Sequence, residues 1–151
     1  MEFNLKDHIK PDAKILLIKL RSIGDVVYNT AVYGPIKKHL PNARLTVLVE
    51  APSYHIVKNH PDVDEVLCFK KTSFFEQVKF YLNLVRNRYD VAIDMHEGTR
   101  GAIMCFLSLA QFKIGNLFAK RSFLYNKKIN FLDLKPALPI EYQVALISKI
   151  G

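Results

Sequence analysis

Residues 14–25 read KILLIKLRSIGD, an apolar run that stops abruptly at small and polar residues. A compact run of this kind is typical of a central β-strand that is buried on both faces. The apolar residues that follow it recur near helical spacing as far as Leu40, and Pro41 ends that pattern. The stretch therefore predicts a strand, a tight turn and a helix, which together form the first part of a β-α-β unit.

The alternation of strand and helix continues along the chain. Strands are predicted at residues 44–50, 65–69, 89–94 and 112–114, with one more near residues 128–131. Helices are predicted at residues 74–88, 99–110 and 140–150, and a short one around residues 53–59. Strands separated by helices predict a Rossmann-like α/β fold, with a parallel sheet covered by helices on both faces. No repeat or linker divides the chain, so we expect residues 1–151 to form one domain.

The composition describes a folded globular protein, because half of the residues are hydrophobic and 24% are charged. The first residues lack the apolar core of a signal peptide. The longest apolar run, residues 102–110, has about half the length that a bilayer requires. The two cysteines, Cys68 and Cys105, lie far apart and match no zinc spacing. We therefore expect a cytoplasmic protein, at most peripheral to a membrane, with buried thiols and no bound metal.

The net charge of +8 is concentrated toward the end of the chain. Residues 51–100 carry seven basic and seven acidic side chains, whereas residues 101–151 carry seven basic and two acidic ones. Between residues 113 and 128 the basic side chains alternate with aromatic ones. Such a segment suits nucleic acid, an anionic lipid or a sugar phosphate, and a solvated lysine surface is the simpler alternative. No RNA-binding signature accompanies it.

Two polar segments follow predicted strands directly, at residues 21–25 and 94–100. In an open parallel sheet, ligands bind beyond the carboxyl ends of the strands, so both segments are candidates for a site. Neither contains G-x-G-x-x-G, which argues against a classical dinucleotide site, and no G-x-x-x-x-G-K-[ST] indicates a P-loop.

Asp25 has two interpretations from its position alone. As a helix N-cap it would stabilise the helix by about 1 kcal/mol, and as a general base it would accept a proton from a substrate. His96 and Glu97 are either loop residues or substrate contacts, because adjacent residues after a strand usually point apart. Thr99 is either a contact of the same kind or the N-cap of the next helix.

Several segments resemble the heptosyltransferases of glycosyltransferase family 9. Residues 14–67 resemble the family's opening, in which a strand leads into S-x-G-D-V and an N-P-x-V-D-E-V turn follows a second strand. Residues 89–102, YDVAIDMHEGTRGA, resemble the family's Y-D-[VL]-x-I-D-x-H-x-x-x-R-[ST]-A segment. Residues 112–129, FKIGNLFAKRSFLYNKKI, are similar to its R-I-G and Y-N segment. The likeness covers nearly the whole chain in the family's order.

The resemblance implies an inverting transfer of heptose from ADP-heptose to the lipopolysaccharide inner core, without an obligatory metal or cofactor. It implies a two-domain GT-B architecture, of which residues 1–151 are the amino-terminal, acceptor-binding half. The carboxy-terminal half that would bind ADP-heptose is expected to be absent from this chain, which alone would be inactive. The expected partners are an anionic lipid-linked sugar acceptor and the inner face of the inner membrane.

The resemblance also assigns site residues. The family's catalytic aspartate falls on Asp25. The substrate-binding residues are expected to be Ser22, Gly24, Asp94, His96, Thr99, Arg100, Lys113 and Arg121, of which the last three would hold acidic groups of the acceptor. The sequence departs from the family at Tyr28, Asn29, Ala31, His60 and Glu97, which leaves the exact acceptor undefined.

Two other classes of function stay open. One is a non-catalytic module that binds an anionic ligand or a membrane surface. The other, which the resemblance disfavours, is a nucleic-acid-binding domain, for which binding would weaken steeply with salt.

Overall fold

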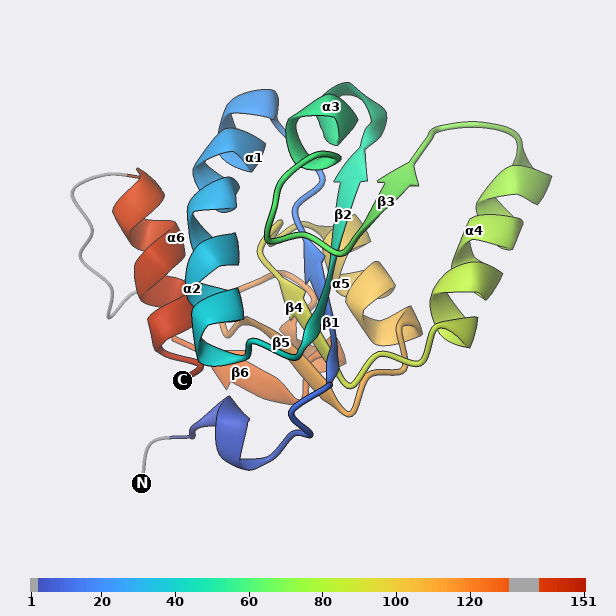
Figure 1. Cartoon of the computed structure of the whole chain (residues 1–151). Coiled ribbons are helices and arrows are strands. Elements are labelled where there is room, and N and C mark those ends of the chain that lie inside the picture. The colour runs from blue at the N-terminus through green and yellow to red at the C-terminus, as the bar shows by residue number, and fades with distance from the viewer. Residues whose placement is uncertain (1–2, 131–138) are drawn as a thin grey trace.

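The computed structural model describes residues 3–130 and 139–151, and it contains a six-stranded sheet whose neighbouring strands are all parallel (Figure 1). The strands are β1 Lys14–Ile18, β2 Arg44–Glu50, β3 Glu65–Phe69, β4 Val91–Asp94, β5 Phe112–Asn116 and β6 Lys127–Ile129. The α-helices are α1 Ile23–Asn29, α2 Tyr33–His39, α3 Tyr54–Val57, α4 Phe74–Arg86, α5 Thr99–Leu107 and α6 Pro139–Ser148. Single 3₁₀ turns occur at η1 Leu5–Asp7, η2 Thr30–Val32, η3 Ala51–Ser53 and η4 Ser122–Leu124.

The predicted Rossmann-like architecture is confirmed. The strand order is β3-β2-β1-β4-β5-β6, which is the order of the doubly wound dinucleotide-binding folds. The strands predicted at residues 44–50 and 65–69 have those bounds, and the helix expected up to Leu40 divides into α1, η2 and α2. The last strand ends at Ile129, and Phe131, its expected end, lies outside the described residues.

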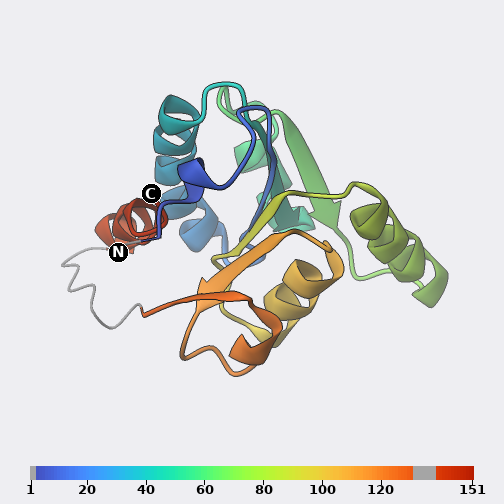
Figure 2. The same ribbon diagram turned by 90° about the horizontal axis from the view of Figure 1, so that it is seen from below.

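Helices cover both faces of the sheet, and a hydrophobic core lies under each layer (Figures 1 and 2). On one face α1, α2, α3 and α6 pack against the strands through side chains such as Val26, Ile36 and Val57. On the other face α4 and α5 do so through Leu84 and Met104. The central strands are buried on both sides, because Leu16 and Leu17 point to opposite faces and each is fully buried. Among the described helices, none combines the length and the apolar character needed to cross a bilayer.

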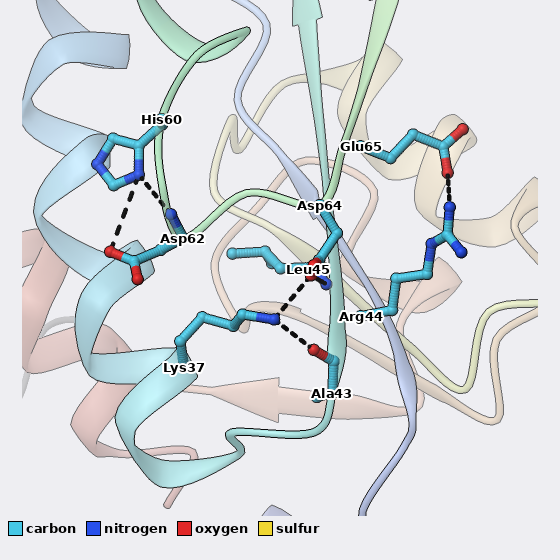
Figure 3. A network of polar contacts seen from close by, with 8 residues as sticks. All are labelled: Lys37, Ala43, Arg44, Leu45, His60, Asp62, Asp64 and Glu65. Carbon is cyan, nitrogen blue, oxygen red and sulfur yellow. Dashed lines mark hydrogen bonds and ion pairs between the residues drawn. The ribbon is translucent and has the colours of Figure 1, made fainter.

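A polar network fixes the amino-terminal edge of the sheet (Figure 3). The Lys37 ammonium group of α2 donates to the Ala43 carbonyl oxygen at 2.7 Å and to Asp64 Oδ2 at 2.8 Å. The same Asp64 oxygen accepts the Leu45 backbone N–H at 2.7 Å. Partial burial raises the pKa of Asp64, but these hydrogen bonds and the lysine charge outweigh it and hold the pKa below 3.8. The V-D-E-V turn therefore serves to tie α2 to β2 and β3.

Asn29 occupies one of the positions at which the sequence departs from the family, and the structure gives it a partner. Its side-chain amide is fully buried at the end of α1 and donates to Gln143 Oε1 of α6 at 2.9 Å. It also lies 3.2 Å from the Met95 sulfur. A buried amide is costly without hydrogen bonds, so the bond to Gln143 stabilises the packing of α1 against α6. The contact with Met95 adds the end of β4 to this link.

Candidate active site at the switch point of the sheet

The strand order reverses between β1 and β4, because the chain leaves β1 toward β2 and leaves β4 toward β5. In folds of this type, the loops after two such strands diverge and leave a crevice at the carboxyl edge, where ligands bind. Both polar segments singled out in the sequence, residues 21–25 and 94–100, lie at this edge. Glu50 joins them from the end of the neighbouring strand β2.

Asp25 lies in the first turn of α1 and is exposed. Its Oδ2 atom accepts the backbone N–H and the hydroxyl group of Ser22, each at 3.2 Å. Ser22 is the N-cap, so the interpretation of Asp25 as the N-cap itself is wrong: Asp25 is the third helical residue of a capping box. Both of these hydrogen bonds fall on Oδ2, which leaves Oδ1 available to accept a further hydrogen bond.

Gly24 lies beside Asp25 on the exposed turn, and a Cβ atom placed there would meet nothing within 4 Å. No packing within the described chain requires glycine at this position. The absence of a side chain leaves the first turn of α1 open to close approach by a ligand.

Lys19 is a site residue that the sequence reasoning overlooked, because it lies within the apolar run that predicts β1. Its side chain is buried, and its ammonium group donates to the Met95 carbonyl oxygen at 2.8 Å. Burial lowers its pKa below 10.5, although the carboxylates of the site oppose that shift: Asp25, Glu97 and Asp94. Lys19 thus places a positive charge beneath the loops that follow β1 and β4. A charged residue inside an otherwise apolar strand was the signal that could have revealed it.

Asp94 ends β4, and its side chain is fully buried. Its Oδ1 atom accepts the backbone N–H groups of His96 at 2.9 Å and Glu97 at 3.2 Å. Its Oδ2 atom accepts the Tyr125 hydroxyl group at 2.6 Å. Asp94 therefore shapes the loop after β4, and direct contact with a substrate, the role expected from the sequence, does not agree with this burial.

Two glycines make room for the Asp94–Tyr125 pair. A Cβ atom on Gly101 would lie 2.5 Å from Asp94 Oδ1, and one on Gly115 would lie 2.4 Å from the Tyr125 ring. Because real Cβ atoms do not approach so closely, both positions require glycine for this packing. The family-like segments R-G-A and K-I-G…Y-N therefore meet at the end of β4.

His96 is half-buried in the loop after β4, with cationic side chains around it. Burial lowers its pKa below 6.5, and the charges of Lys19, Arg21 and Arg100 lower it further, whereas Glu50 opposes them. Both effects favour the neutral form of the imidazole. A Cβ atom on Gly98 would lie 2.8 Å from His96 Nε2, so this glycine gives the ring its space.

Replacing Lys19 by methionine is expected to raise the pKa of His96 toward 6.5. The substitution keeps the aliphatic stem and removes a positive charge that disfavours the imidazolium ion. An NMR titration of the His96 ring protons measures this shift. Lys38→Met, which removes an exposed lysine of α2, is the matched control and should leave the His96 titration unchanged. A His96 pKa that stays in place in Lys19→Met would contradict the arrangement.

Glu97 and Thr99 complete the loop. Glu97 has a positive φ of 61°, and its Oε2 atom accepts the side-chain amide of Asn116 at 3.2 Å. Thr99 is exposed at the first position of α5, and its N-cap is Gly98, so the alternative interpretation of Thr99 as an N-cap is wrong. The Thr99 hydroxyl group thus lies at the carboxyl edge of the sheet, where a ligand can contact it.

Arg100 binds Glu50 across the edge of the sheet, through a short ion pair between its Nη1 atom and Glu50 Oε1. Its guanidinium group also lies over the Phe69 ring, 5.5 Å from the ring centroid. The residue is held in place by two elements, β2 and β3. The structure therefore places Arg100 at the candidate site with its Nη1 atom already paired with the Glu50 carboxylate.

The basic segment near the end of the chain does not form one surface. Lys113 lies at the amino-terminal end of β5, and its ammonium group donates to the carbonyl oxygen of Ala110, just before that strand, at 2.8 Å. The structure therefore does not bring Lys113 to the candidate site, which lies at the opposite edge of the sheet. Lys127 lies 4.3 Å from the Phe3 ring centroid, and Tyr125 is buried against Asp94. Arg121 alone of the expected phosphate-binding residues in this segment is exposed in the connection after β5, on the side of the carboxyl edge.

A largely apolar cavity of about 300 Å³ lies elsewhere, between α2, α6 and the central strands. Its walls include Leu5, Ile36 and Ile147, and none of the expected site residues lines it. Within residues 3–130 and 139–151, no cluster of three or more histidine, cysteine or acidic side chains is arranged to hold a metal ion. Cys105 is buried and Cys68 half-buried, and both are free thiols.

The sequence is similar to lipopolysaccharide heptosyltransferases. It is 28% identical over 123 residues to lipopolysaccharide heptosyltransferase 1 of Campylobacter coli, a match that covers 78% of this chain and 36% of that protein. It is 22% identical over 140 residues to lipopolysaccharide heptosyltransferase 3 of Escherichia coli, covering 87% of this chain and 41% of that one. No family model matches the sequence.

Solved structures show the same fold. A glycosyl transferase family 9 protein from Veillonella parvula superposes with a TM-score of 0.78 at 18% identity, over 100% of this chain and 42% of that one. The E. coli heptosyltransferase WaaC with ADP-2-deoxy-2-fluoro heptose gives 0.78 at 22% identity, over 90% of this chain and 47% of that one. The resemblance to glycosyltransferase family 9 heptosyltransferases is thus confirmed, and the chain spans less than half the length of the proteins that it matches.

Proposed function

We propose that residues 1–151 form the acceptor-binding, amino-terminal half of a heptosyltransferase that transfers heptose from ADP-heptose to the lipopolysaccharide inner core. The observation that carries the proposal is the meeting of an exposed carboxylate, Asp25, with a group of cationic side chains at the switch point of the sheet. The heptosyltransferase relatives support the substrate class. A donor-binding half would close the crevice from the other side.

Asp25 is the proposed general base. As the acceptor hydroxyl oxygen attacks the anomeric carbon of the heptose, its proton would pass to Asp25 while the bond to the ADP oxygen breaks. This single displacement inverts the anomeric centre. The two hydrogen bonds from Ser22 to Oδ2 fix the carboxylate and leave Oδ1 for the proton. ADP would leave toward the other half.

The capping role of Asp25 and the catalytic role are compatible. The positive end of a helix favours the ionised carboxylate and so makes it a weaker base. A weak base still suits this reaction, because the attacked centre becomes cationic and the acceptor proton is transferred late. The capping box then serves to orient the carboxylate toward the crevice.

Cationic groups at the same edge are proposed to hold an acidic acceptor. Arg21 is exposed next to Ser22, and Arg121 is exposed after β5. Lys19 is buried beneath the loops that follow β1 and β4. Arg100 lies at the same edge, in its ion pair with Glu50. An arginine can bind a carboxylate or phosphate with two parallel hydrogen bonds, which suits the acidic sugars and phosphates of an inner core.

Isothermal titration of the 151 residues tests this assignment. We expect a deacylated inner-core acceptor that lacks heptose to bind, and Arg21→Gln to weaken that binding by about tenfold, which corresponds to the loss of one charged hydrogen-bonding partner. Lys38→Gln, on α2, is the matched control. ADP-heptose should not bind measurably. Binding of ADP-heptose without binding of the acceptor would instead make this the donor half.

A further inference from the structure

Helix α4 is apolar on two faces, and only one of them contacts the rest of the protein. Leu84 is fully buried and Phe80 half-buried against Phe69 of β3, with the two rings 5.2 Å apart. Away from that face, the helix turns four apolar side chains to the solvent: Phe74, Phe75, Val78 and Leu82. Phe74 and Phe75 are 76% and 82% exposed and contact each other edge to face. Their spacing places all four on one stripe of the helix.

Basic side chains border the apolar stripe at its two ends and along one side. Residues 70–88 contain five basic side chains and one acidic one, which are Lys70, Lys71, Lys79, Arg86, Arg88 and Glu76. Lys70 and Lys71 are exposed immediately before the two phenylalanines. At helical spacing, Lys79 and Arg86 lie on the same side of the stripe, two turns apart. We refer to this stripe with its five basic residues as the α4 surface.

A groove of about 620 Å³ runs along the α4 surface, between the helix and the end of β3. Lys70, Lys79 and Arg86 line it, together with Glu76, Thr72 and Asn83. Leu82 belongs both to the groove and to the apolar stripe, so the two features are continuous. The cationic groove suits the phosphate headgroups of a bilayer, and the exposed aromatic side chains beside it suit the hydrocarbon beneath the headgroups.

We propose that the α4 surface docks the protein on an anionic phospholipid bilayer. Phe74 and Phe75 insert below the headgroups, Val78 and Leu82 lie at their level, and the flanking lysines and arginines contact lipid phosphates. This combination of a cationic rim and exposed large apolar residues is that of helices which lie in a membrane interface without spanning it.

The charge of this surface favours a bilayer over the other occupants. A second copy of the chain docked face to face would bring two sets of the same five basic residues together, which is electrostatically unfavourable. Single-stranded nucleic acid would stack on the phenylalanines, yet the aliphatic Val78 and Leu82 offer no such stacking. Acyl chains accept all four side chains.

The position of the α4 surface agrees with a lipid-linked substrate. Helix α4 begins after the carboxyl end of β3, so Phe74 and Phe75 lie toward the same edge of the sheet as Asp25 (Figure 1). This relation to the acceptor rests on the proposed function, whereas the docking itself does not. Vesicles without acceptor test the docking, and the deacylated acceptor tests the site, so the two proposals can fail separately.

Vesicle co-sedimentation of the 151-residue chain is the experiment. We expect binding to vesicles of phosphatidylcholine and phosphatidylglycerol in equal parts, at least about tenfold stronger than to phosphatidylcholine alone, since each lysine near an anionic surface contributes about 1 kcal/mol. Phe74→Ser with Phe75→Ser should weaken binding to the mixed vesicles by about tenfold or more. Lys70→Gln with Lys71→Gln should have a similar effect.

Matched controls remove the same chemistry from the opposite edge of the sheet. Leu109→Ser removes an apolar side chain that is 58% exposed at the end of α5, and Lys6→Gln with Lys10→Gln removes two exposed charges before β1. Both should bind as the wild type does. All of the substituted side chains are exposed, so circular dichroism should show unchanged folding for every variant.

Three results would overturn the proposal. One is binding to mixed vesicles that Phe74→Ser with Phe75→Ser leaves intact. Another is a dimer, detected by light scattering, that the same substitution dissociates, because the α4 surface would then be an interface between copies of this chain. The third is displacement of the vesicles by a single-stranded oligonucleotide bound through the same residues.

Discussion

Asp25→Asn is expected to lower heptose transfer by about 100- to 10,000-fold in an enzyme that contains these residues together with a donor-binding half. The amide cannot accept the acceptor proton, yet it is nearly identical in shape and its oxygen can still accept the hydrogen bonds from Ser22. Binding of the acceptor should change little, so the loss should appear in kcat. A coupled assay of ADP release measures it.

Ser22→Ala is the matched control for the capping role. It removes the hydroxyl group of the same capping box and costs the helix about 1 kcal/mol, while the Asp25 carboxylate stays. We expect Asp25→Asn to lose far more activity than Ser22→Ala, and Ser22→Ala to lose more stability than Asp25→Asn. If transfer by the two variants followed their melting temperatures instead, Asp25 would be a helix-capping residue without a role in catalysis.

Asp94 is expected to make the stability of the protein fall as the pH rises from about 4 to about 6. Burial raises the pKa of Asp94 to about 6, against the opposing hydrogen bonds from Tyr125, His96 and Glu97, whereas the unfolded chain titrates near 3.8. The folded state therefore binds more protons than the unfolded state across this range, and its relative stability decreases as they are released. The contribution that is lost amounts to about 3 kcal/mol at most.

Urea unfolding at several pH values, compared between wild type and Asp94→Asn, isolates this contribution from other titrating groups. The wild type should lose stability relative to the variant as the pH rises. Tyr125→Phe removes a hydrogen bond that lowers the Asp94 pKa, so in that variant the loss should extend to higher pH. Parallel pH profiles for wild type and Asp94→Asn would show that folding does not change the pKa of Asp94, which would contradict the prediction.

The sheet could be predicted from the sequence because its central strands carry the apolar pattern of strands buried on both faces. β2 and β3 have the predicted bounds, since polar or turn-forming residues mark both of their ends. The helix after β1 was predicted as one piece, and a hydrophobic pattern alone does not reveal the 3₁₀ turn at η2. The strand order follows from no local signal, because it depends on which strands pair across long separations.

The candidate site was predicted in part. The sequence places Ser22, Asp25, His96, Thr99 and Arg100 after neighbouring strands, and parallel pairing brings these segments to one edge. It could not show that Asp94 points inward, because this depends on Tyr125, which is 31 residues away. Lys113 was misplaced for a similar reason: a basic residue in a charged segment gives no indication that its ammonium group binds the Ala110 carbonyl oxygen.

NMR chemical-shift mapping during titration with the deacylated inner-core acceptor tests most directly whether the switch point is the acceptor site. We expect the largest shifts in the backbone amides of residues 21–25 and 96–100, which lie on either side of the crevice between β1 and β4. Shifts confined to the amino-terminal edge around Lys37 and Asp64, or no shifts at acceptor concentrations that saturate a heptosyltransferase, would contradict the assignment.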